Sequence, residues 1–242
     1  AHHVGPLTVQ RPFYPEGETC HLYLLHPPGG VVGGDTLDIS VRLDAKSHTL
    51  ITMPGASKFY RSSGPQARLS QHFYLDEGST LEWLPQDTII FPGANAALRS
   101  VFHLKASSTL LAWELYCLGR PVINETFSHG TLESRLEVWV EDEPRLIERQ
   151  HLGDGDLTPV AGHPWIGTLL FYPANEEHLD TVRALLAPLG HFAGATLTDE
   201  LLSVRFLSHD NLICQRVMRD IWQSLRPLLT TKTACSPRIW QT

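Results

Sequence analysis

The chain has 242 residues, 42% hydrophobic and 19% charged, a composition typical of a folded globular protein. Its 19 lysines and arginines against 26 aspartates and glutamates give a formal net charge of −7, which argues against sequence-independent nucleic-acid binding. No apolar run approaches the roughly 18 residues of a membrane span, and the first residues lack the layout of a signal peptide. The four cysteines form no CxxC pair, so we expect reduced thiols in a cytoplasmic protein.

The first distinctive segment is 9–35, VQRPFYPEGETCHLYLLHPPGGVVGGD, which holds four prolines and five glycines around one short apolar run. The pattern predicts a strand, then a tight turn at 27–30, then a glycine pair before Asp35. A turn of this kind fixes the position of Asp35. The segment is not a phosphate-binding P-loop, because Asp35-Thr36-Leu37 stands where Lys-Ser/Thr and a helix would be needed.

One turn pattern recurs along the next hundred residues. An alternating strand ends in an aliphatic residue, a polar turn follows, and a second strand begins; the copies start at Leu43, Leu75, Leu104 and Val140. Alternation around polar turns is typical of β-strands. Spacings of 32, 29 and 36 residues favour stacked layers, as in a solenoid or an elongated sandwich. An ordinary meander of hairpins would give a similar pattern, because turn chemistry is limited.

The last third of the chain predicts two helices with a strand between them. Residues 176–189 place aliphatic side chains on one helical face, with Asn175 as N-cap. A second helix is expected over 211–226, with Pro227 ending it, and a strand over 201–207. No linker divides the chain, so we expect one mainly β domain over 1–242 with two helices in its C-terminal half.

Thirteen histidines invite a metal hypothesis, but none of the short spacings of a permanent metal site is present. His21 and His26 flank the apolar run, five residues apart, and so fall on opposite faces of an extended strand. No GxSxG motif occurs, and Ser57 in Pro-Gly-Ala-Ser-Lys is interpreted as a turn hydroxyl rather than a nucleophile.

The carboxylates are better candidates than the histidines for binding a divalent cation. Glu18 and Asp35 lie in the opening segment, and Glu114 and Glu148 occupy similar places after two of the repeated turns. In a stacked fold, equivalent positions line up and would form a row of oxygen donors for a divalent cation. The alternative is that each carboxylate is an ordinary salt-bridge partner, with Arg149 beside Glu148 and Arg120 near Glu114.

Several segments together resemble the urease accessory protein D family, called H in some organisms. The resemblance rests on the opening segment, on TMPGASKFYRS (52–62), LEWLPQDTIIFPGA (81–94), WELYCLGRP (113–121) and the ending PRIWQT (237–242), and it covers nearly the whole chain in order. Members commonly carry one further β segment before the first of these blocks, so the resemblance also implies an additional N-terminal strand.

The resemblance implies a cytoplasmic scaffold rather than an enzyme. Relatives join an F protein and a GTP-hydrolysing G protein to apo-urease and help to insert nickel at a carbamylated lysine, with nickel held only in transit. It also implies a β stack with an internal channel for nickel. On that basis, the expected path residues are Asp35 and Glu148 first, then Glu18 and Glu114, with Ser57 as a polar lining residue. His21 and His26 are outside candidates.

A partner surface is expected on the second helix and at the C-terminus. Arg216, Arg219 and Gln223 lie off the apolar face of that helix, and Trp240 is an aromatic anchor near the end of the chain. The alternative is ordinary solvated helix surface. Two other functions stay open: an all-β hydrolase or lyase with Glu114 and Glu148 as acid and base, and a binding module without a metal role.

Overall fold

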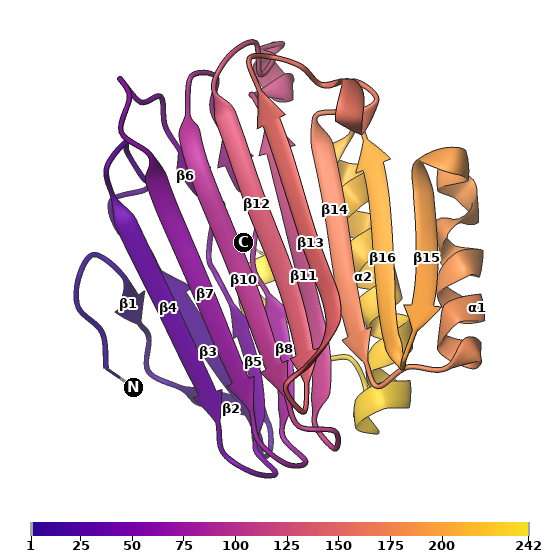
Figure 1. Cartoon of the computed structure of the whole chain (residues 1–242). Helices are drawn as coiled ribbons and strands as arrows, with labels where there is room; N and C mark the ends of the chain where they lie inside the picture. Colours follow the sequence, from indigo (N-terminus) through magenta and orange to yellow (C-terminus); the bar gives the residue numbers. More distant parts are fainter. Residues whose placement is uncertain (1, 242) are drawn as a thin grey trace.

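In the computed structural model, which describes residues 2–241, two β-sheets face each other and two helices cover the outer side of the larger sheet (Figure 1). The large sheet has 11 strands. Its main path runs β1 (Thr8–Val9), β3 (Thr19–Leu25), β5 (His48–Thr52), β8 (Thr80–Leu84), β11 (Thr109–Leu118), β14 (Trp165–Tyr172), β16 (Leu201–Ser208) and β15 (Ala193–Thr198). β2 (Phe13–Glu16), β6 (Ser57–Phe59) and β9 (Thr88–Ile90) join it from the side. The mainly β prediction with stacked layers is confirmed.

The small sheet has five strands and lies in front of the large one in Figure 1. Its order is β13 (Glu143–Gly153), β12 (Thr131–Val140), β10 (Asn95–Leu104), β7 (Ala67–Leu75) and β4 (Thr36–Leu43). Inward-facing residues of both sheets form the main core, in which the rings of Phe73 and Phe102 stack at 4.7 Å and Trp83 packs beside them. No helix covers the outer face of the small sheet in Figure 1.

The repeated turns are the corners of the stack. β4, β7, β10 and β12 pair in parallel, and their last residues Leu43, Leu75, Leu104 and Val140 stand in register. In the first three turns a serine hydroxyl donates to the carbonyl three residues earlier, each at 2.7 Å, and the chain crosses from the small sheet to the large one. The fourth turn differs, because β12 and β13 form an antiparallel hairpin within the small sheet.

The helices confirm most of the sequence expectation. α1 (Glu176–Leu186) begins at Asn175, whose side chain accepts from the His178 N–H at 3.1 Å. α2 (Asn211–Thr230) passes through Pro227, so the expected stop at that residue was wrong. Pro227 is exposed near the end of the helix, where proline removes only one N–H donor. Short 3-10 turns occupy Pro121–Ile123, Thr158–Val160, Ala187–Phe192 and Arg238–Gln241. Among the described residues no helix has the length and apolar character of a membrane span.

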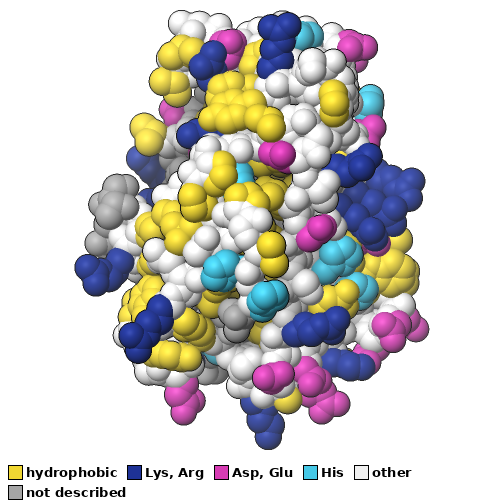
Figure 2. All heavy atoms as spheres, turned by 90° about the vertical axis from the view of Figure 1, so that its left-hand side faces the viewer, with side chains coloured by type: hydrophobic (Ala, Val, Ile, Leu, Met, Phe, Trp, Pro, Cys, Tyr) yellow, Lys and Arg dark blue, Asp and Glu magenta, His cyan; other side chains and the backbone are white. Residues whose placement is uncertain are grey.

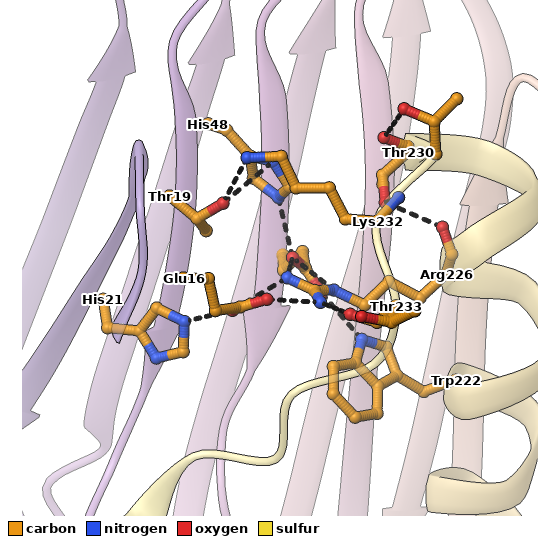
Figure 3. Close-up of polar contacts among 11 residues, drawn as sticks. Glu16, Thr19, His21, His48, Trp222, Arg226, Thr230, Lys232 and Thr233 are labelled. Atoms are coloured by element: carbon orange, nitrogen blue, oxygen red, sulfur yellow. Dashed lines mark hydrogen bonds and ion pairs between the residues drawn. The ribbon is translucent and has the colours of Figure 1, made fainter. Parts of the chain in front are cut away.

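A buried ion pair joins α2 to the large sheet. Glu82 on β8 points to the outer face, and both Glu82 and Arg226 of α2 are fully buried. Arg226 Nη2 lies 2.9 Å from Glu82 Oε1. The same nitrogen donates to Glu16 Oε1 at 3.0 Å (Figure 3), so one guanidinium binds two carboxylates. Trp222 Nε1 and His48 Nε2 also bond Glu82, each at 2.7 Å. The cluster thereby connects β2, β5, β8 and α2.

The chain after α2 is held by the same cluster. Arg226 donates to the carbonyl of Thr233, and Lys232 Nζ donates to Thr19 Oγ1 at 2.7 Å. Glu16 also bonds His21 Nε2 at 2.6 Å (Figure 3). His21 therefore belongs to a structural network on the outer face of the large sheet.

The ionised state of Glu82 is stabilised by its partners. Burial alone would raise its pKa, but the hydrogen bond from His48 and the charge and hydrogen bonds of Arg226 outweigh burial and lower the pKa below 4.5. Removing one partner of a buried ion pair leaves the other charge uncompensated, which is far more costly than losing an exposed pair.

We therefore expect Arg226→Met to lower the free energy of unfolding by about 3–5 kcal/mol. Urea denaturation of the purified chain measures this. Arg216→Met, an exposed arginine on the same helix, is the matched control and should change it by less than about 0.5 kcal/mol. Equal effects of the two substitutions would contradict the structural role of the ion pair.

The lowered pKa of Glu82 also predicts a pH dependence of stability. As the pH falls, Glu82 is protonated in the unfolded chain before it is protonated in the folded one. Its contribution to stability is therefore complete above the ordinary pKa of 4.5 and is lost as the pH falls through the lowered pKa. Chemical denaturation between pH 3 and 6 should show a weaker loss of stability in Glu82→Gln than in the natural chain. Parallel profiles for the two proteins would contradict this assignment.

Candidate functional site

A second buried carboxylate lies between the two sheets. Leu110, Ala112, Glu114 and Tyr116 alternate on the inner face of β11, so Glu114 lies among apolar core residues. Its carboxylate accepts from Ser100 Oγ and, at 2.6 Å, from the hydroxyl of Tyr116. Gln71 donates to Ser100 Oγ at 3.0 Å, so a polar chain runs across the core.

Burial dominates the electrostatics of Glu114. Desolvation raises its pKa, opposed by the hydrogen bonds from Ser100 and Tyr116 and by the charge of Arg205. Burial and the nearby Glu114 likewise raise the pKa of Tyr116 well above its ordinary value, so the hydroxyl stays protonated and can donate. A buried carboxyl with a raised pKa beside a cavity is a candidate functional group.

Glu114 and Glu148 line one cavity of about 430 Å³, which we call the Glu114 cavity. Glu148 comes from β13 of the small sheet, and both of its oxygens are bonded by Arg205 of β16. The two carboxyls therefore face each other across the gap between sheets. This corrects the expectation that they occupy equivalent places in one stacked row, and the reason is the antiparallel β12–β13 hairpin.

Two narrow cavities adjoin the Glu114 cavity between the sheets. The first shares Glu114 and Tyr116 with it and is also lined by Ser57, Met53 and Gln71. The second shares Ser57 and Met53 with the first and reaches His26. Each measures about 20 Å³, room for about one water molecule.

The second narrow cavity borders a larger opening of about 720 Å³, which we call the N-terminal groove. The groove lies between the start of the chain, β3 and β4, and shares Leu7, Leu24, Leu37 and Ile39 with the narrow cavity. Figure 2 faces this edge and shows hydrophobic side chains along it with histidines near the centre. The four spaces form a series between the sheets.

The predicted path residues are placed differently. Glu148, Glu114 and Ser57 lie in sequence along this series. Asp35 is exposed, and its carboxylate accepts from the Val32 N–H at 3.0 Å within its own turn. Glu18 is exposed in the turn between β2 and β3. Neither lines the four spaces, and a path role for them stays a prediction.

His26 lies at the end of the narrow cavities, unlike His21. Burial lowers the pKa of His26, while the charge of Asp35 raises it, so Asp35 acts on this side chain across space. Arg120, expected near Glu114, instead pairs with Glu125 at the surface. Within residues 2–241, no three His, Cys, Asp or Glu side chains are grouped closely enough to hold a metal ion together.

The predicted interface residues fall into two groups. Arg216 and Gln223 are exposed on α2. The Trp240 ring packs against Trp113 and Trp222 at 5.4 Å, its Nε1 donates to Thr52 Oγ1 at 3.2 Å, and the Arg219 guanidinium lies over it at 5.5 Å. Trp240 and Arg219 therefore hold the chain end onto the molecule.

Sequence reasoning missed several residues of the site: Gln71, Ser100, Tyr116 and Arg205. One signal was available, because Gln71 and Ser100 are polar at inward positions of otherwise apolar strands. Arg205 gave a similar signal at an inward position of β16.

The chain matches known sequences over its whole length. A family model described as UreD urease accessory protein matches residues 1–241. A urease accessory protein UreD from Enterobacter sp. (strain 638) is 77% identical over 242 residues, all of this chain and 88% of the relative. UreD proteins from Klebsiella aerogenes and Pseudomonas putida (strain GB-1) are 70% and 55% identical over 100% and 99% of the chain, covering 90% and 87% of those relatives. The chain therefore belongs to the UreD family of urease accessory proteins, a family of urease maturation rather than of enzymes.

Proposed function

We propose that this chain is a scaffold that joins the F and G accessory proteins to apo-urease and passes nickel through the space between its two sheets. The observation that carries the proposal is the series of four spaces in which Glu148, Glu114 and Ser57 follow one another. Oxygen donors bind a divalent cation exchangeably, whereas a cage of cysteine and histidine would retain it.

The two carboxyls would act differently on the ion. Glu148 lies at the wider cavity, half-exposed and paired with Arg205, so an arriving cation takes the place of the guanidinium. Burial raises the pKa of Glu114, so a proton competes with nickel for its carboxylate more strongly than at an exposed glutamate. That competition favours a short stay of the ion at the buried position.

Beyond the carboxyls, the path holds weaker donors. The Ser57 hydroxyl lies 3.9 Å from the Met53 sulfur, and both line the two narrow cavities. Since these cavities have room for about one water each, the ion would pass with few of its waters while the sheets open slightly. His26 then receives it at the last polar position of the narrow cavities, where they border the N-terminal groove.

The exposed side of α2 would supply the contact with a partner. Leu212 and Ile213 are exposed at its start, and Arg216 and Gln223 follow along the same helix. Arginine beside exposed aliphatic residues is a common composition of interfaces. The proposal therefore assigns Arg216 and Gln223 to partner contact, and Trp240 and Arg219 to stabilising that surface.

We expect Glu114→Gln to lower the nickel content of urease by about ten-fold, the lower end of the affinity lost at altered metal sites. The chain itself should be as stable as before or more stable at neutral pH. A carboxyl with a folded-state pKa above the unfolded one opposes folding as the pH rises. The measurement is nickel per urease in cells that carry the variant in place of the natural chain.

The matched control for that substitution is Asp87→Asn. Burial also raises the pKa of Asp87, but this carboxyl bonds Asn211 and Gln215 of α2 and lies outside the four spaces. Normal nickel loading with Glu114→Gln, or an equal loss with Asp87→Asn, would refute the path.

Glu148→Gln tests whether the two carboxyls act in series. If nickel passes both, the double variant with Glu114→Gln should load urease no worse than the weaker single variant, because one interrupted step already limits delivery. If the double variant instead lowers nickel loading by the product of the two single losses, the residues act separately. Co-purification with the F protein, measured in parallel, should be unchanged in all three proteins.

A further inference from the structure

The outer face of the small sheet carries a row of arginines. By strand register, Arg99 of β10 stands beside Arg135 of β12, and Arg135 beside Arg149 of β13. Arg68 of β7 lies on the same face, and these four side chains line one depression of about 550 Å³. Neighbouring strands lie about 4.8 Å apart, so like charges placed directly opposite one another destabilise the sheet.

Two carboxylates partly compensate the four arginines of this row, Glu137 and the Glu133 that lines the same depression. Glu137 is 2% exposed and accepts from Arg99 Nη2 at 3.0 Å, while Arg135 Nε lies 2.5 Å from the same oxygen. Arg149 has no ion-pair partner among the described residues, and Arg68 bonds only the neutral Gln66, at 3.0 Å. The row therefore keeps uncompensated positive charge on a chain of net charge −7.

A ladder of stacked side chains adjoins the arginines. The Arg42 guanidinium lies 4.1 Å from the Tyr74 ring centroid, and the Tyr74 and His103 rings stack at 4.9 Å with 4° between their planes. Trp139 is the register neighbour of His103, and its Nε1 donates to Glu137 at 3.1 Å. These rings are already ordered, so binding against them costs little side-chain entropy.

Figure 2 shows Lys and Arg side chains gathered at its right-hand edge, the side on which the small sheet lies. Arginine, tyrosine and tryptophan are the residues that most often dominate interface energies. Binding of nucleic acid draws on many phosphate contacts along an extended basic surface, whereas these four arginines are confined to one depression, so an acidic protein surface matches them better.

We infer that this outer face binds an acidic surface of a partner protein, with carboxylates on the arginine row and side chains packed against the half-buried rings of Tyr74, His103 and Trp139. The inference rests on the proposed scaffold function in one respect. A protein that joins partners needs separate surfaces for them, and this face lies on the opposite side of the molecule from α2 (Figure 1).

The test uses the purified full-length chain and poly-L-glutamate as an acidic polypeptide probe, with poly(U) for comparison. Arg68→Glu/Arg149→Glu should weaken poly-L-glutamate binding at least about ten-fold, because neither side chain supports Glu137 and both are exposed. Arg68→Lys/Arg149→Lys should retain most of the binding. The control Arg11→Glu/Arg61→Glu makes the same charge change at exposed positions elsewhere and should stay within about two-fold.

Equal binding by the natural chain and the Arg68→Glu/Arg149→Glu variant, or an equal loss in the control, would overturn the inference. Tighter binding of poly(U) than of poly-L-glutamate would also overturn it, in favour of nucleic acid. Nickel loading of urease in cells separates this result from the proposed function. If Arg68→Glu/Arg149→Glu loses poly-L-glutamate binding but urease is still loaded normally with nickel, this face has no role in urease maturation. Normal nickel loading with Glu114→Gln refutes the nickel path alone.

Discussion

The buried pair of Glu82 and Arg226 is the interaction on which the rest of the architecture depends. It joins residues 144 positions apart and holds α2 against the outer face of the large sheet, so that the second hydrophobic core can close beneath the helix. Because side chains alternate along a strand, fixing Glu82 outward also fixes Trp83 inward. Trp83 lines the first narrow cavity beside Glu114 and Ser57, so the ion pair sets the geometry of the candidate path from the opposite side of the sheet.

The pKa values of two buried glutamates in the same sheet are shifted in opposite directions. Glu82 touches a guanidinium and two further donors, and its pKa is lowered. Glu114 receives only hydroxyl donors, with Arg205 acting at a distance, and burial raises its pKa. The lowered pKa favours the ionised form of the first carboxylate, which is held within the structure. Burial favours the protonated form of the second, and the proposed transfer role uses the resulting competition between proton and cation.

The sequence contains enough information to predict the stack but not the partners of its buried charges. Alternation and polar turns identify the corners, and Leu43, Leu75, Leu104 and Val140 stand in register as the spacing suggested. The pairing of Glu82 with Arg226 joins a strand to a distant helix, and no local pattern encodes it. Pro227 shows the same limit, since the anchored Arg226 and the exposed position allow the helix to continue.

The candidate site was only partly predictable, for a topological reason. Glu114 and Glu148 would be equivalent members of one row only if every repeat crossed between the sheets. The fourth repeat folds back within the small sheet, so Glu148 faces Glu114 across the cavity. The choice of these residues did bring together two lining residues of one space. Asp35, which the rigid turn places at the surface, acts on His26 through its charge rather than by lining the series.

The proposed cation path and the positively charged face can exist in one molecule because most of the arginines near them point away from the path. Arg68, Arg99, Arg135 and Arg149 project outward from the small sheet, and solvent screens their charges from the interior side. Among the residues that line the four spaces, Arg205 is the inward-facing arginine beside Glu114, and Glu148 neutralises it. Sheet alternation thus separates the proposed anion-binding face outside from the proposed cation path inside by a single layer of backbone.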